Sequence, residues 1–149
     1  MSIRRATPED LDSIKNICID SFMLSIAPTL EEEGVNTFQS IVSVNALNSR
    51  IEQGNLMIVY ENNNEIVGVL ELKEARHIAM LFVSPKFQNR GVGRSLMLAM
   101  YEYIKSNMIT VSASLTSVSA YLSYGFEYSG VVSESAGLKY QPMEMKVFK

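Results

Sequence analysis

The chain has 149 residues, of which 47% are hydrophobic and 19% are charged, and its formal net charge at pH 7 is −3. This composition is typical of a globular protein with a sizeable core, and it excludes a disordered or fibrous chain. No Lys/Arg-rich run occurs, so we expect no nucleic-acid partner, because such a partner requires a basic surface. The length predicts one domain over residues 1–149.

Cysteine, histidine and apolar runs restrict the remaining classes. Cys18 and His77 are the only residues of their types, so we expect neither an internal disulfide nor a zinc site, and no other metal. The N-terminus becomes polar at once, unlike a signal peptide, and no apolar run approaches the roughly 20 residues that span a bilayer. These features predict a cytoplasmic protein without a membrane partner, in which Cys18 is a core residue.

In chain order, the first half predicts a short strand, two helices and then three strands in series. Thr7-Pro8 marks a helix start, because threonine caps helices well and proline suits the first helical position. A second helical period runs from Val35 to about Gln53. The pattern then becomes extended. The predicted strands are residues 2–6, 56–60, 65–73 and 77–83.

The second half predicts two more helices and three more strands. An amphipathic helix follows Gly93, and a short helix over residues 116–124 is closed by Gly125 as a left-handed cap. Strands are expected at residues 109–115, 126–132 and 143–148, with a loop at residues 133–139. The resulting order, βααβββαβαββ, predicts a single mixed α/β domain.

Residues 80–93 form the most informative segment of the chain. An apolar run ends at Ser84-Pro85, and a polar turn then leads through Gly91-Val92-Gly93 into the amphipathic helix. A glycine turn before a helix presents free N–H groups and the positive end of the helix dipole, which together bind an anion such as phosphate.

Two common phosphate-binding motifs do not fit this turn. The triphosphate loop requires Lys and Ser/Thr directly after its last glycine, whereas Arg94 and Ser95 follow Gly93 here. The dinucleotide fingerprint requires a small residue where this chain has Leu96. The remaining pattern is Q-x-x-G-x-G after an apolar strand.

This pattern resembles the pyrophosphate loop of the GNAT superfamily of N-acetyltransferases, and the order of elements resembles that fold over nearly the whole chain. The resemblance implies a mostly antiparallel sheet flanked by helices, and acetyl-CoA as cosubstrate. It places the strand residues Leu81, Phe82 and Val83 against the pantetheine arm. It places the pyrophosphate against the backbone of Gln88, Asn89, Arg90, Gly91, Val92, Gly93 and Arg94.

A second segment, Ala120–Phe126, is similar to the Y-x-x-x-G-F signature of the same family. The resemblance puts Tyr121 beside the thioester sulfur, where it is our candidate general acid; the alternative is that Tyr121 only packs on the cofactor. Tyr124 replaces the usual aliphatic residue and is interpreted as structural. Ser114 stands where many members have asparagine, which weakens one expected contact with the CoA arm.

The catalytic base is less determined. His77 has an unperturbed pKa near 6.5 and aligns with the glutamate base of the histone-acetyltransferase branch, but it is equally interpretable as a structural residue at a strand edge. Glu71 or Glu74, acting through water, is the competing hypothesis.

The acceptor is expected to be a primary amine of a small molecule or peptide. Glu31, Glu32 and Glu33 favour a cationic amine, or else form a solvated first helical turn, whereas Phe22 and Phe38 with Tyr140 would form an apolar wall. An alternative function is a catalytically inactive CoA-binding sensor or interaction domain of the same fold. Exposed sheet edges make a homodimer possible.

Overall fold

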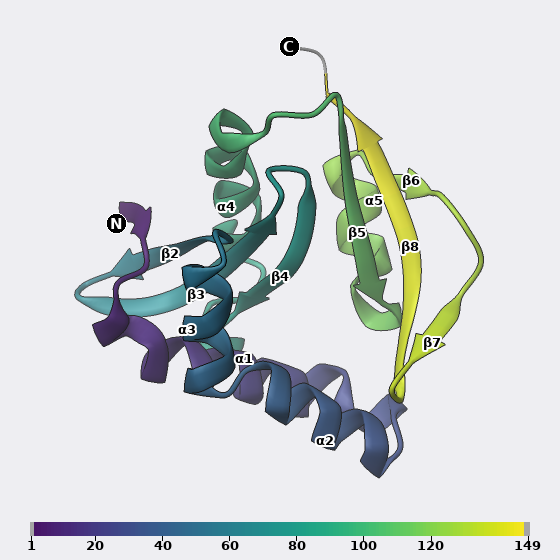
Figure 1. The fold of residues 1–149 in the computed structure, drawn as a ribbon, viewed down its shortest axis with the longest axis horizontal. Helices are drawn as coiled ribbons and strands as arrows, with labels where there is room; N and C mark the ends of the chain where they lie inside the picture. The colour runs from purple at the N-terminus through teal and green to yellow at the C-terminus, as the bar shows by residue number, and fades with distance from the viewer. Residues whose placement is uncertain (1, 148–149) are drawn as a thin grey trace.

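The computed structural model describes residues 2–147. Its strands are β1 (Ser2–Arg5), β2 (Leu56–Asn62), β3 (Glu65–Lys73), β4 (His77–Val83), β5 (Met108–Ser114), β6 (Glu127–Tyr128), β7 (Ser133–Ser135) and β8 (Leu138–Lys146). Its α-helices are α1 (Leu11–Ser25), α2 (Glu32–Ile41), α3 (Val44–Glu52), α4 (Val92–Met100) and α5 (Val118–Tyr124). The strands form one sheet in the order β1-β2-β3-β4-β5-β8-β6, with β7 beside β8 (Figure 1).

The sheet carries a separate hydrophobic core on each face. Alternate residues of β2 and β3 point to opposite faces, so that Ile58 and Leu70 join the core under α4 and α5, whereas Val59 and Val69 join the core under α1, α2 and α3. Cys18 lies in the second core and is fully buried, as expected. Burial raises the pKa of its thiol to about 12, so the thiol is unreactive at neutral pH.

The sheet divides in its middle, between β4 and β5. These two strands are parallel and pair only at His77 with Thr110 and at Ile78 with Val111, whereas every other strand pair within residues 2–147 is antiparallel. Beyond these residues the strands separate, and the sheet opens in the shape of a V (Figure 1). The prediction of a mixed, mostly antiparallel sheet flanked by helices is confirmed.

A β-bulge lies in β4 at the start of this opening. Glu71 pairs with Met80 and Leu72 with Ile78, which leaves Ala79 as an extra residue without a partner in β3. Such bulges bend a strand and increase its twist. The bulge therefore directs the second half of β4 away from β5.

The predicted helix over residues 35–53 is two helices instead. Ser43 interrupts it, since its backbone is not helical and its Oγ accepts a hydrogen bond from the Ala46 N–H at 3.2 Å, which caps α3. The apolar period continues across this break, so the periodicity alone does not reveal it.

The prediction of a loop at residues 133–139 is wrong. β7 and β8 form a hairpin in which Ser135 pairs with Leu138 across the two-residue turn Ala136-Gly137. Both turn residues have positive φ, 49° and 82°, as in a type I′ turn, which asparagine, aspartate and glycine favour. Alanine in the first position hides this turn in the sequence. Strand β8 therefore begins at Leu138 rather than at Met143, and Phe148 of the predicted last strand lies outside the described residues.

None of the helices within residues 2–147 is long and apolar enough to cross a membrane. Within the same range, no three His, Cys, Asp or Glu side chains gather in a group that could hold a metal ion.

Candidate active site

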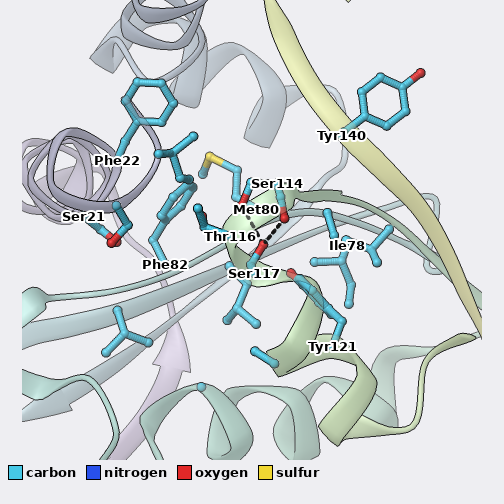
Figure 2. Close-up of a pocket in the computed structure, with 18 of the residues that line it drawn as sticks. Ser21, Phe22, Ile78, Met80, Phe82, Ser114, Thr116, Ser117, Tyr121 and Tyr140 are labelled. Atoms are coloured by element: carbon cyan, nitrogen blue, oxygen red, sulfur yellow. Dashed lines mark hydrogen bonds between the residues drawn. The ribbon is translucent and has the colours of Figure 1, made fainter. Parts of the chain in front are cut away.

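The opening between β4 and β5 is a cavity of about 1300 Å³. Its walls come from β4, the glycine turn, the N-terminus of α4, β5, α5, the segment from α1 to α2, and the β7–β8 hairpin. In Figure 2, Tyr121 and Ser117 lie on the side of α5, Phe22 and Phe82 lie on the side of α1 and β4, and Tyr140 belongs to β8. Segments that are far apart in the sequence thus meet around one space.

The edge of β4 supplies free backbone groups to this cavity. The N–H of Ser84, the residue after β4, donates to the Val67 carbonyl of β3 at 2.8 Å. The backbone N–H and C=O groups of successive residues in a strand point in opposite directions. Those of Phe82 therefore point towards β3, like the N–H of Ser84, and those of Leu81 and Val83 point away from β3 and towards the cavity. The Val83 carbonyl accepts from Gln88 Nε2 at 3.1 Å. Within residues 2–147, β4 has no strand partner on this side beyond Ile78, so both backbone groups of Leu81 and the N–H of Val83 are available to a ligand.

The glycine turn forms part of the cavity wall. Asn89 and Gly91 both have positive φ, 63° and 83°, and Gly91 directly precedes the first residue of α4. A Cβ on Gly91 would meet no atom within 4 Å, so the space beside this backbone is open. The first N–H groups of a nine-residue helix and an accessible glycine backbone form an anion cradle.

Arginine and tyrosine side chains surround this cradle. Arg94 lines the cavity, and its guanidinium lies over the Tyr124 ring, 5.4 Å from the centroid. The Tyr124 hydroxyl lies so close to Gly93 that a Cβ there would come within 2.7 Å of it. Arg90 instead lies over the Phe87 ring at 5.5 Å and does not line the cavity.

Tyr121 places its hydroxyl in the cavity. Its ring is 5% exposed and makes edge contacts with Tyr124 and Phe126, with centroid distances of 5.9 and 5.4 Å. Within residues 2–147 the hydroxyl has no hydrogen-bond partner. In the same range, every side-chain oxygen or nitrogen atom that is itself buried does have a partner, so the Tyr121 oxygen is not one of the buried atoms. The oxygen must therefore be accessible from the cavity. Burial, and then Tyr124, raise the pKa of Tyr121, which keeps the hydroxyl protonated.

A match to a protein family shows to which family the chain belongs. The model of the acetyltransferase (GNAT) domain matches residues 26–147. The chain belongs to the GNAT family of acetyltransferases.

Individual relatives agree with this assignment. An uncharacterised N-acetyltransferase of Archaeoglobus fulgidus is 30% identical over 115 residues, which cover 69% of this chain and 73% of the relative. A GCN5-related N-acetyltransferase of Rhodopseudomonas palustris has the same fold, with a TM-score of 0.86 and 23% identity over 98% of this chain and 95% of that chain. The PaiA N-acetyltransferase of Thermoplasma acidophilum, solved in complex with coenzyme A, has a TM-score of 0.81 and 19% identity over 97% and 98%.

Acetyl-CoA is the acetyl donor of GNAT acetyltransferases, and the cavity has features that suit it. The extended pantetheine arm carries amide groups, and the free edge of β4 offers matching donors and acceptors. The pyrophosphate is an anion, and the glycine turn with Arg94 offers N–H groups and positive charge beside open space. The donor set of this GNAT chain therefore fits the group.

The structure places the predicted base outside the cavity. His77 is half-buried at the point where β4 and β5 are paired, and its Nδ1 lies 2.8 Å from Thr110 Oγ1. It is not among the residues that line the cavity. Burial, and then the charges of Lys73 and Arg76, lower its pKa. This geometry gives His77 no direct access to an acceptor amine.

The two alternative bases are also absent from the cavity. Glu71 is fully buried, and its carboxylate accepts from Arg50 Nε at 2.8 Å and from Asn55 Nδ2 at 2.7 Å. Glu74 lies in the exposed turn after β3 and pairs with Arg76 at 3.1 Å. Neither carboxylate lines the cavity, so the hypothesis of a glutamate acting there is not supported by the geometry.

Of the residues predicted to bind the acceptor, two line the cavity and two do not. Phe22 and Phe38 line the cavity and stack on each other, with centroids 3.9 Å apart and an angle of 7° between the rings. Glu32 and Glu33 are exposed on the first turn of α2 and do not line it. The acidic residues therefore fit the solvated helix turn, not a wall of the site.

Sequence reasoning misses the hydroxyl groups that follow Ser114 among the lining residues. Thr116, Ser117 and Ser119, after β5 and at the start of α5, line the cavity, and Ser117 Oγ lies 2.6 Å from Ser114 Oγ. The sequence places the acceptor side at residues 23–38 and 133–141, and Leu138, Lys139 and Tyr140 of the second segment do line the cavity. It misses only that this segment is a hairpin and not a loop.

Proposed function

We propose that the protein transfers the acetyl group of acetyl-CoA to a primary amine by direct attack of the amine on the thioester. One observation carries this proposal: the edge of β4, the hydroxyl of Tyr121 and the glycine turn all line the same cavity. This arrangement supplies both a place for the donor and a proton donor beside it.

We assign donor binding to the predicted residues, with refinements for Phe82, Gln88 and Arg90. Leu81 and Val83 bind the pantetheine amides through their backbone, and Phe82 contributes its side chain to the opposite wall. The backbone from Gln88 to Val92, together with Gly93 and Arg94, holds the pyrophosphate. The Gln88 side chain acts indirectly, because its amide is already bound to the Val83 carbonyl. Arg90 contributes charge from outside the cavity.

The chemical step needs stabilisation of the developing oxyanion and a proton for the departing thiolate. A backbone N–H at the β4 edge donates to the carbonyl oxygen as its negative charge grows, and such preorganised donors usually contribute more to the rate of acyl transfer than any other group. Tyr121 donates its phenolic proton to the sulfur as the C–S bond breaks, and the resulting phenolate then regains a proton from water. Because its pKa is raised, Tyr121 releases the proton only when the thiolate charge has developed.

The acceptor amine loses its proton without help from a carboxylate or imidazole. No Asp, Glu or His of residues 2–147 lines the cavity, so the amine enters in its neutral form, and its second proton leaves to water after attack. The pH dependence of the rate then follows the pKa of the amine and not that of a protein group.

The experiment is a screen of amines with acetyl-CoA, read by release of free thiol and by the mass of the acetylated product. Cys18 does not disturb the thiol assay, since it is buried and its pKa is about 12. We expect amine-dependent thiol release with at least one acceptor. Binding of acetyl-CoA without an acetylated product for any amine would support the inactive CoA-binding domain instead.

A further inference from the structure

Resting on the proposed amine acetylation, we propose that the acceptor is a small primary amine with an apolar body and no second positive charge. The segment from α1 to α2 and the β7–β8 hairpin form the part of the cavity that takes this body. We call this part the acceptor pocket. Its apolar lining residues are Phe22, Ile26, Leu30, Phe38, Phe82, Leu138 and Tyr140, and the uncharged hydroxyl residues Ser21, Ser25, Thr37 and Ser135 of the same segments also line it.

The first argument is the apolar character of the acceptor pocket. The stacked rings of Phe22 and Phe38 are almost fully buried behind the surface, and Phe82 meets Phe38 edge to face at a centroid distance of 5.4 Å. The side chains of Leu30 and Leu138 are partly exposed, so part of this apolar surface is open to a ligand. An apolar group that covers it is stabilised because both surfaces are removed from water.

The second argument is charge. Among the described residues that line the whole cavity, Arg94 and Lys139 are the only charged ones, and both are basic. Arg94 belongs to the donor end, so the single charged group near the acceptor pocket repels a cation. A second ammonium group of a diamine or polyamine would lose its hydration there without a carboxylate to compensate, which is costly.

The third argument is the contact that joins the two walls of the acceptor pocket. Gly34 of α2 packs against the backbone of Gly137 so closely that a Cβ on either glycine would overlap the other chain segment. Thr37 Oγ1 donates to the Ala136 carbonyl at 2.7 Å. Figure 1 shows the β7–β8 turn beside α2. This contact bridges the pocket on one side and favours a small acceptor.

The experiment compares amines that differ in a second charge alone. Hexylamine and 1,6-diaminohexane have the same chain, and 2-phenylethylamine and spermidine extend the comparison. We expect kcat/KM for the monoamines hexylamine and 2-phenylethylamine to be at least tenfold higher than that for 1,6-diaminohexane and spermidine, which carry more than one amine. An equal or higher value for the polyamines would overturn the inference while leaving amine acetylation intact. No product from any amine would instead contradict the proposed function.

Two variants locate the selectivity. Leu138→Glu introduces a carboxylate into the acceptor pocket and should shift the ratio of the two kcat/KM values towards 1,6-diaminohexane by at least tenfold. The double variant Glu32→Gln/Glu33→Gln removes carboxylates that lie outside the cavity and should leave the ratio unchanged. A change of the ratio in the double variant, which alters only exposed residues, would show that α2 recognises a cation and would overturn the inference even if Leu138→Glu fails to fold.

Discussion

His77 and Thr110 join β4 and β5 at the point where the sheet divides, with Nδ1 of His77 2.8 Å from Oγ1 of Thr110. The two residues are also partners in the register of these parallel strands. After the next pair the strands separate and the cavity begins. His77, the only histidine of the chain, therefore links β4 to β5 at the point where the two strands are still paired.

This position predicts a pH dependence of stability. Burial lowers the pKa of His77 below its unfolded value of about 6.5, so the folded state binds fewer protons than the unfolded state. The free energy of unfolding should therefore decrease as the pH falls below about 6.5. Urea unfolding at pH 7.5 and 5.5 measures the decrease, and His77→Gln should reduce it. The same decrease in the variant would show that another group titrates.

Tyr121→Phe tests the proposed proton donor. The variant keeps the ring and its contacts with Tyr124 and Phe126 and removes only the hydroxyl. We expect kcat to fall by about 10²-fold or more, the usual contribution of general acid catalysis, with unchanged acetyl-CoA affinity and thermal midpoint. Steady-state kinetics and calorimetric titration separate these quantities. Full activity would show that Tyr121 only packs on the donor.

Gly91→Leu tests the anion cradle, and Gly54→Leu is its matched control. Both glycines have positive φ, 83° and 104°, and a Cβ on either would meet no atom within 4 Å. Each substitution should therefore cost a similar backbone strain of about 1–2 kcal/mol. Only Gly91 lies beside the cavity, so only Gly91→Leu should weaken CoA binding, by at least tenfold in Kd. Equal CoA affinities of the two variants would remove Gly91 from the donor site.

The ion pair of Arg50 and Glu71 predicts a large effect on stability. Glu71 has no exposed side-chain surface, and Arg50, 24% exposed, binds it from α3 while its Nη1 donates to the Ile41 carbonyl at the end of α2. Arg50→Met leaves a buried carboxylate with Asn55 alone, which should cost about 3–5 kcal/mol.

Replacing both partners tests the reason for this cost. Arg50→Met/Glu71→Leu removes the uncompensated charge, so the double variant should be more stable than Arg50→Met in urea unfolding. A double variant as unstable as the sum of the two single variants would show that the pair acts through packing and not through charge.

The elements that could be predicted from the sequence are those that depend on short local patterns of residues. The glycine turn, the start of α4 and the Tyr121-to-Gly125 signature each depend on residues adjacent in the chain, because turns and helix caps are set by neighbouring φ/ψ preferences and hydrogen bonds. The break at Ser43 and the Ala136-Gly137 turn escape prediction because their local patterns mislead. The apolar period continues across the first, and alanine replaces the usual turn residue in the second.

The sequence by itself therefore determined the strand, glycine turn and helix that we propose hold the donor, since these elements follow one another within residues 77–100. The tertiary structure decided the rest. The register of β4 against β5 put His77 at the closed end of the V, and the ion pair with Arg50 occupied Glu71. The contact of Gly34 with Gly137 brought α2 and the β7–β8 hairpin together around the acceptor pocket. Such long-range pairings depend on packing between distant segments, which no local pattern in the chain encodes.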